Sequence, residues 1–177
     1  MNNIKPNRLE IKPIPYQLHL AAQHFANIHQ RPWAMLLRSP SRTHVDSRFD
    51  ILVAEPKATI TTLGNESYIV TQGVKETSSD NPFELLKRVQ AQVLPNLDYS
   101  GELPFIGGAL GYFSYDLGRR VERMPSLAKQ DLVTPDMAIG LYDWALIVDH
   151  KEKSAYVVGS DTEEKWQWLT SQPENKV

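Results

Sequence analysis

The sequence predicts an α+β fold in which helices flank mainly antiparallel β-sheet layers. Short segments alternate between apolar and polar residues, turn residues join them at hairpin distance, and a few other segments carry apolar residues at helical spacing. The expected order is helix, strands, helix, strands, helix, which is typical of this fold class. With 177 residues, the chain is expected to form one domain over residues 1–177.

Helices are expected at three places. Residues 16–29 carry apolar side chains three or four positions apart, so they form one apolar stripe. Asn81 can cap a second helix, which begins at Pro82 and closes before Pro95. A third helix is expected after Asp161, which is expected to cap it.

Strands are expected where a short apolar or alternating segment is bounded by turn residues. Before the second helix, such segments lie at residues 33–37, 48–54, 58–63 and 67–71. The last two are expected to form a hairpin through Gly64-Asn65. Residues 137–149 are apolar on both faces and predict one central strand covered on both sides, with residues 154–158 as its hairpin partner.

Glycine interrupts an aromatic, strand-like segment at residues 103–115. Because glycine weakens a strand, it usually marks a bulge or a close approach of two backbones. The cluster lacks the Lys-Ser/Thr pair of a P-loop and the spacing of a dinucleotide-binding fingerprint. We therefore expect a bulged or closely packed strand, followed by a short helix or turn at residues 116–123.

The composition excludes several classes of function. The chain has no cysteine, which excludes disulfides, thiolate catalysis and cysteine zinc sites. Its formal net charge of -2 provides no basic field for nucleic acid or an acidic membrane. Residues 1–15 lack the apolar segment of a signal peptide and no apolar run is long enough to span a membrane, so a cytoplasmic protein is expected. None of the five histidines falls in a metal-binding motif, and no metal site is expected here.

The polar loop at residues 38–50 is the best candidate for a binding site, because it lies between two apolar strands that can hold it rigidly. Arg48 could hold the carboxylate of an amino acid with two parallel hydrogen bonds. Ser39 or Asp50 could receive its ammonium group. The alternative, favoured by the residues alone, is that Arg48 and Asp50 form a surface ion pair with each other.

Four segments, at residues 32–39, 47–56, 103–120 and 136–150, follow one another as in a known family. Together they resemble the amino-terminal domain of component I of para-aminobenzoate synthase (aminodeoxychorismate synthase), in the anthranilate synthase component I superfamily. The resemblance covers most of the chain between residues 32 and 150. It implies mainly antiparallel sheet layers flanked by helices.

The resemblance also implies an enzyme that aminates chorismate to 4-amino-4-deoxychorismate, for para-aminobenzoate and folate synthesis. Chorismate and a glutamine amidotransferase subunit that supplies ammonia are the implied partners, and magnesium is the implied cofactor. In the family, the catalytic residues and magnesium ligands lie in the carboxy-terminal half. This chain is therefore expected to be the amino-terminal portion, inactive alone, and no catalytic residue is assigned to it.

The resemblance further implies a pocket for L-tryptophan, which serves as the feedback site in anthranilate synthases. The matching positions are Leu37, Ser39, Ser47, Arg48, Phe49 and Asp50. Asp46 stands where relatives can carry an aromatic residue, and an acid there could weaken or reshape the pocket.

Two alternatives stay open. The first is component I of anthranilate synthase, which serves tryptophan biosynthesis, although residues 116–119 and 141–150 look closer to the para-aminobenzoate branch. The second is a stand-alone domain that binds an amino acid and regulates without catalysis.

Overall fold

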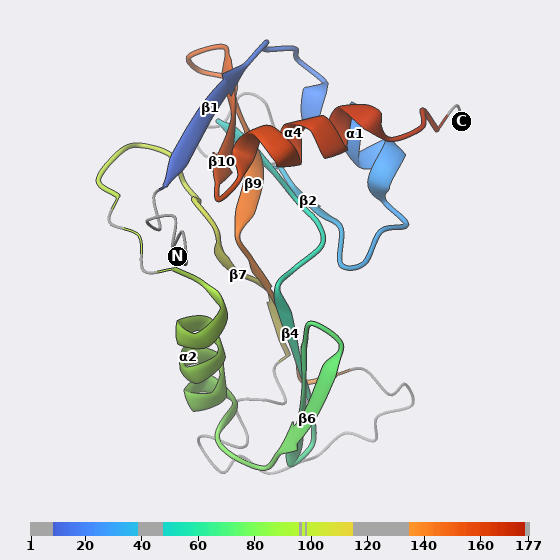
Figure 1. Ribbon diagram of the computed structural model, residues 1–177, viewed down its shortest axis with the longest axis vertical. Coiled ribbons are helices and arrows are strands. Elements are labelled where there is room, and N and C mark those ends of the chain that lie inside the picture. The colour runs from blue at the N-terminus through green and yellow to red at the C-terminus, as the bar shows by residue number, and fades with distance from the viewer. Residues whose placement is uncertain (1–8, 39–47, 96, 98, 115–134, 176–177) are drawn as a thin grey trace, which may run out of the picture. The chain divides into compact units, whose positions relative to one another are not determined.

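The computed structural model (Figure 1) describes residues 9–38, 48–95, 97, 99–114 and 135–175. The chain divides into two compact units. The first unit comprises residues 1–56, 95–108 and 142–177, and the second comprises residues 57–94 and 109–141. The expectation of one domain stays a prediction, whereas the α+β class with antiparallel sheets is confirmed.

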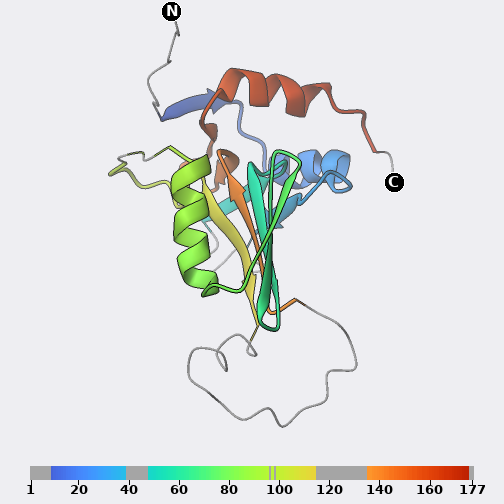
Figure 2. The same cartoon turned by 60° about the horizontal axis from the view of Figure 1, so that its bottom comes forward.

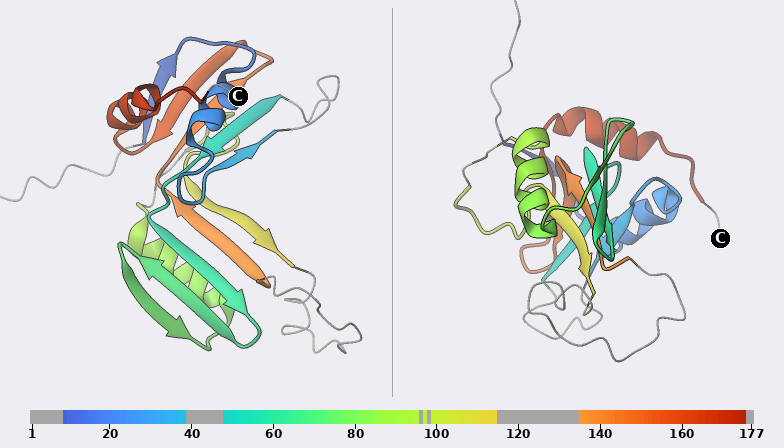
Figure 3. Two further views of the ribbon diagram at one scale, coloured as in Figure 1. Left: turned by 90° about the vertical axis from the view of Figure 1, so that its right-hand side faces the viewer. Right: turned by 90° about the horizontal axis from the view of Figure 1, so that it is seen from below.

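The first unit contains a five-stranded sheet with the order β1-β10-β9-β3-β2. Its strands are β1 (Glu10–Ile14), β2 (Met35–Leu37), β3 (Phe49–Val53), β9 (Trp144–Asp149) and β10 (Ser154–Gly159). Helices α1 (Leu20–Ile28) and α4 (Thr162–Ser171) pack on one face of this sheet (Figure 3). The core between these helices and the sheet contains Trp144, whose indole N–H donates a hydrogen bond to the carbonyl of Ala54 at 2.9 Å.

The second unit contains a sheet with the order β6-β5-β4-β8-β7. Its strands are β4 (Ala58–Leu63), β5 (Glu66–Thr71), β6 (Val74–Ser78), β7 (Gly108–Phe113) and β8 (Met137–Tyr142). Helix α2 (Pro82–Val93) packs along this sheet (Figure 2), with Leu85 and Val89 buried against Ile60 and Ile139. The predicted hairpin is confirmed, because β4 and β5 pair in antiparallel register across Gly64-Asn65.

The predicted helices are all present, but only one predicted cap is correct. The side chain of Asn81 accepts a hydrogen bond from the backbone N–H of Phe83 at 2.9 Å, and Pro82 occupies the first helical position. Asp161 has a left-handed backbone (φ +50°) instead of the extended conformation of an ordinary N-cap, and its side chain makes no capping bond. In the described ranges, every helix is too short or too polar to cross a membrane.

The prediction of one strand over residues 137–149 is wrong. The segment breaks at Asp143, so that β8 belongs to the second sheet and β9 to the first. The Asp143 carbonyl accepts a bond from the N–H of Ser160 at 2.8 Å, and its buried carboxylate accepts bonds from Lys165 at 3.2 and 3.3 Å. The predicted burial is confirmed, since nearly every residue of both strands is buried.

Two strands were not predicted from the sequence. β1 lies in a polar segment and pairs with β10 at one edge of its sheet. β6 lies at the edge of the other sheet, and all but its last residue are exposed. Edge strands carry polar residues that protect them from pairing with other chains, so their hydrophobic pattern is weak.

The glycine-rich segment behaves as expected. Gly107 and Gly108 have φ angles of +112° and +136°, which side chains rarely permit, and β7 begins at the second of them. A Cβ atom on Gly111 would overlap the carbonyl oxygen of Ala138 in β8. A close backbone approach therefore requires glycine at position 111. The expected helix or turn at residues 116–123 lies outside the described residues.

Gly111→Ala is expected to lower the free energy of unfolding by about 3 kcal/mol, because the new methyl group meets backbone that cannot move away. Gly73→Ala is the control: it has a positive φ but open space around it, so we expect a loss of about 1 kcal/mol. Urea unfolding measures both variants. Equal losses would contradict a close approach of β7 and β8.

Candidate functional site

The residues predicted to bind an amino acid lie where β2 ends and β3 begins. Leu37 ends β2, is 42% exposed and stands opposite Ile51 of β3. Phe49 and Asp50 are the first two residues of β3, directly after Arg48. The structure therefore brings Leu37, Arg48, Phe49 and Asp50 to neighbouring strands of one sheet. Ser39, Asp46 and Ser47 lie outside the described residues.

Arg48 binds a carboxylate with two hydrogen bonds, but the carboxylate belongs to this chain. Its Nε donates to Asp149 Oδ1 at 2.9 Å, and its Nη2 donates to Asp149 Oδ2 at 2.8 Å. Nη2 also donates to Glu102 Oε2 at 3.2 Å, and the guanidinium carbon lies 4.6 Å from the centre of the Phe49 ring. Arg48 thus makes a two-bond contact with Asp149, and its predicted contact with a ligand carboxylate stays a prediction.

Asp149 is held in its ionised form. Its side chain is 5% exposed, and Oδ1 also accepts bonds from the backbone N–H groups of Lys151 and Glu152 at 3.0 and 3.3 Å. The hydrogen bond from Arg48 is the main reason why the pKa of Asp149 lies below its ordinary value, although burial opposes the effect. The same bond raises the pKa of Arg48.

Asp50 takes part in a second chain of contacts. Its Oδ2 lies 2.8 Å from His150 Nε2, and His150 Nδ1 lies 2.9 Å from the hydroxyl of Tyr16. Both hydrogen bonds form when His150 Nε2–H donates to Asp50 and His150 Nδ1 accepts from the Tyr16 hydroxyl. The N–H of His150 also donates to the carbonyl of Arg48 at 2.8 Å.

These contacts overturn the alternative pairing proposed from the sequence. Arg48 pairs with Asp149 and Asp50 pairs with His150, instead of with each other. Asp149 and His150 were missed as members of this site. The antiparallel register of β3 and β9 brings them to the site by placing Phe49 opposite Asp149, and no pattern in the sequence indicated that pairing.

The described residues do not fit a magnesium site. They hold no group of three or more His, Cys, Asp or Glu side chains placed to bind a metal ion. Magnesium is usually bound by one or two carboxylates in near-octahedral geometry, together with water or substrate oxygens. The paired carboxylates of Asp50 and Asp149 are already bound to His150 and Arg48.

Comparison with known proteins gives relatives over most of the chain. The profile of a family described as chorismate binding enzyme matches residues 16–176. Aminodeoxychorismate synthase component 1 of Escherichia coli (strain K12) is 46% identical over 152 residues, which are 84% of this chain and 33% of that protein. The chloroplastic anthranilate synthase alpha subunit 2 of Arabidopsis thaliana is 34% identical over 121 residues, which are 63% of this chain and 19% of that protein.

A solved structure has a similar fold. The crystal structure of anthranilate synthase component I from Streptococcus pneumoniae TIGR4 matches with a TM-score of 0.56 and 23% sequence identity, over 81% of this chain and 32% of that chain. This chain spans 33% to 36% of the length of the aminodeoxychorismate synthase relatives that it matches.

Asp149→Asn is expected to lower the free energy of unfolding by about 2 kcal/mol at neutral pH, because a charge-assisted double hydrogen bond is weakened. Asp161→Asn is a matched control, since Asp161 makes no side-chain capping bond and asparagine tolerates a left-handed backbone. Guanidinium unfolding measures both variants, and equal stabilities would contradict the importance of the pair.

The Asp149 pair also predicts a dependence on pH. The folded pKa of Asp149 is lowered, so its contribution is complete above the ordinary value of 3.8 and is lost as the pH falls through the lower folded value. Thermal unfolding between pH 6 and about pH 2 should show a steeper loss of stability in the original chain than in Asp149→Asn. If stability falls equally with pH in both proteins, the ion pair of Asp149 does not cause the pH dependence.

Proposed function

The chain belongs to the family of chorismate-binding enzymes, and from this membership we propose that it forms the amino-terminal part of an aminodeoxychorismate synthase component 1. The proposed activity of the whole protein is the amination of chorismate to 4-amino-4-deoxychorismate, for para-aminobenzoate and folate synthesis. The observation that carries the proposal is the 46% identity to the Escherichia coli protein of that name. This identity extends over more of the chain than the 34% identity to the anthranilate synthase subunit.

The proposed cofactor and partners belong to the whole protein. A glutamine amidotransferase subunit would supply ammonia, in keeping with the component numbering of the relatives. Magnesium would be held outside the residues described here, which lack a suitable group of ligands. The cytoplasmic location stays a prediction.

We propose that the described residues contribute a rigid support and not the reacting groups. Two side-chain contacts join the start of β3 to the end of β9, namely the ion pair of Arg48 with Asp149 and the hydrogen bond between Asp50 and His150. They fix the start of β3, where the chain passes from the polar loop into the sheet. Such support is what a binding loop needs to keep its geometry.

The pocket for L-tryptophan also stays a proposal, with the residues predicted from the sequence: Leu37, Ser39, Ser47, Arg48, Phe49 and Asp50. The contacts of Arg48 suggest how it would act there. Its guanidinium is bound to Asp149 and packs on the Phe49 ring, so it would position the aromatic wall instead of binding the ligand's carboxylate.

Grafting this chain into each of the two synthases in turn tests the choice between them. We expect this chain to restore chorismate amination when it replaces the matching segment of the Escherichia coli aminodeoxychorismate synthase component, assayed with chorismate, ammonia and magnesium. The same graft into an anthranilate synthase should lose at least tenfold in rate, since packed interfaces tolerate few mismatches. Activity only in the anthranilate synthase host would favour the second candidate, component I of anthranilate synthase.

Tryptophan binding is tested by calorimetric titration of the purified chain with L-tryptophan. We expect Ser39→Ala to weaken binding about tenfold, because a hydroxyl that accepts a hydrogen bond from a charged ammonium group is lost. Ser171→Ala on α4 is the matched control and should bind as the original chain does. If folded protein shows no binding, the pocket proposal fails for this chain.

A further inference from the structure

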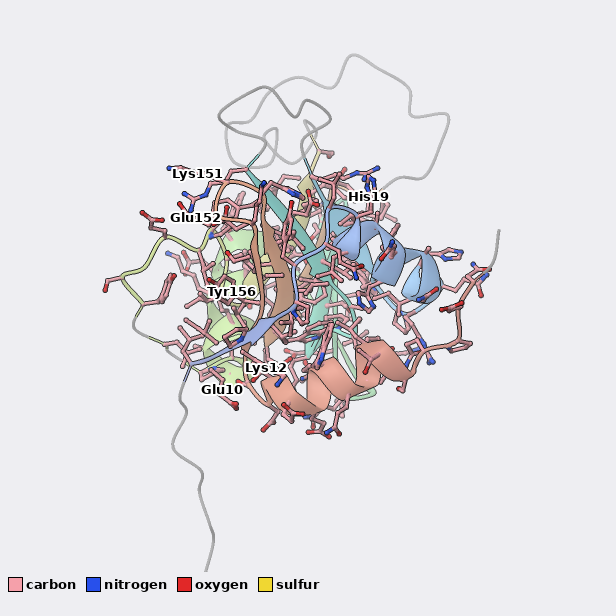
Figure 4. The ribbon with its side chains drawn as sticks, turned by 90° about the horizontal axis from the view of Figure 1, so that it is seen from above. Glu10, Lys12, His19, Lys151, Glu152 and Tyr156 are labelled. Atoms are coloured by element: carbon pink, nitrogen blue, oxygen red, sulfur yellow. The ribbon has the colours of Figure 1, made fainter. Side chains whose placement is uncertain are left out.

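A cavity of about 330 Å³ opens on the first sheet, on the face opposite helices α1 and α4. Its floor includes Phe49, Asp149 and Ser154, which are cross-strand neighbours on β3, β9 and β10 and therefore point to the same face. Tyr99, Glu102 and Leu103 contribute to its wall. Glu152, in the turn between β9 and β10, and Tyr156 of β10 also line it (Figure 4).

The charges of this cavity favour a cation. Three carboxylates line it, those of Glu102, Asp149 and Glu152, against the single guanidinium of Arg48. Arg48 is already bound to Asp149 and Glu102. The carboxylate of Glu152 makes no ion pair with any residue that the structure describes. An anionic ligand would meet this excess of negative charge, whereas a cation would be attracted by it.

The walls of the cavity suit an organic cation better than a bare ion. Phe49, Tyr99 and Tyr156 contribute three aromatic rings to its lining. Aromatic faces attract ammonium groups and also bury apolar carbon. The volume lies at the small end of the range for ligand pockets, so the ligand would be a small molecule.

A buried hydroxyl in this lining lacks a hydrogen-bond partner. Ser154 Oγ is inaccessible to solvent and has no partner among the described residues. An unpaired buried hydroxyl is unfavourable and usually indicates a water molecule or ligand that would bond to it. From the described residues, Asp149 Oδ2 on the neighbouring strand accepts one bond, that of Arg48 Nη2, so it retains an acceptor position toward them.

We propose that this cavity binds a small organic amine in its protonated form. The ammonium group donates hydrogen bonds to Ser154 Oγ and to the carboxylates of Asp149 and Glu152, and the apolar body of the ligand lies against the aromatic rings. The site shares Arg48 and Phe49 with the predicted tryptophan pocket but contains neither of its serines. Amine binding here would be a function separate from the proposed amination of chorismate.

Three probes of similar size test the proposal by calorimetry on the folded chain: tyramine, which is cationic, 4-ethylphenol, which is neutral, and 3-(4-hydroxyphenyl)propionate, which is anionic. We expect tyramine to bind at least tenfold more tightly than the neutral probe, since hydrogen bonds from a charged donor are the stronger kind. The anionic probe should not bind. The proposal is wrong if 4-ethylphenol binds as tightly as tyramine, or if tyramine does not bind at about 10 mM.

Two variants locate the site. Glu152→Gln should weaken tyramine about threefold, because its carboxylate is partly screened by water, and the matched control Glu164→Gln on α4 should leave binding unchanged. Ser154→Ala should weaken tyramine about fivefold without lowering the melting temperature, since the hydroxyl has no partner to lose. A lower melting temperature with unchanged tyramine binding would show a purely structural hydroxyl and overturn the assignment.

Discussion

Strand β9 is buried along its whole length, and the first sheet depends on it. A fully buried strand needs backbone partners on both edges and apolar cover on its faces. β10 and β3 supply the backbone partners, and α1 and α4 cover one face. Where β9 ends, Asp149 and His150 bind side chains at the start of β3. The most buried strand therefore also fixes the position of the candidate binding residues.

Arg48 connects the structural and the functional interpretations of this site. Its double hydrogen bond to Asp149 neutralises a carboxylate that is almost fully buried, and its guanidinium packs on Phe49. Removing either partner would leave a poorly solvated charge, which is the costly way to lose an ion pair. The proposed amine cavity and the proposed tryptophan pocket share Arg48 and Phe49, so a ligand in one would alter the surroundings of the other.

The family membership and the geometry support a structural role for the described residues within the proposed synthase. Three carboxylates of the described residues are held by basic side chains: Asp149 by Arg48, Asp50 by His150 and Asp143 by Lys165. Such groups support a binding loop well but are poorly available for acid–base catalysis or metal binding. In the proposed synthase, this chain would accordingly supply shape and ligand contacts to a larger enzyme.

The sequence by itself determined most local features. Apolar spacing predicted the helices, the turn at Gly64-Asn65 predicted a hairpin, Asn81 predicted a cap, and the glycine cluster predicted the close approach at Gly111. The helices, the hairpin and the cap depend on residues close together in the chain, and the glycine cluster marked β7 as a strand that another backbone approaches closely. The sequence also provided the residues that carry the family resemblance, although Ser39 and Ser47 lie outside the described structure.

Only the tertiary structure decided the partners of the site and the break at Asp143. Arg48 and Asp149 are 101 positions apart, and hydrophobic periodicity carries no information on which strand will pair with which. The segment at residues 137–149 is apolar on both sides of Asp143, so its pattern fits one strand as well as two. The break follows from contacts made by Ser160 and Lys165 after folding. Strand pairing is a long-range choice, whereas caps, turns and periodicity are local ones.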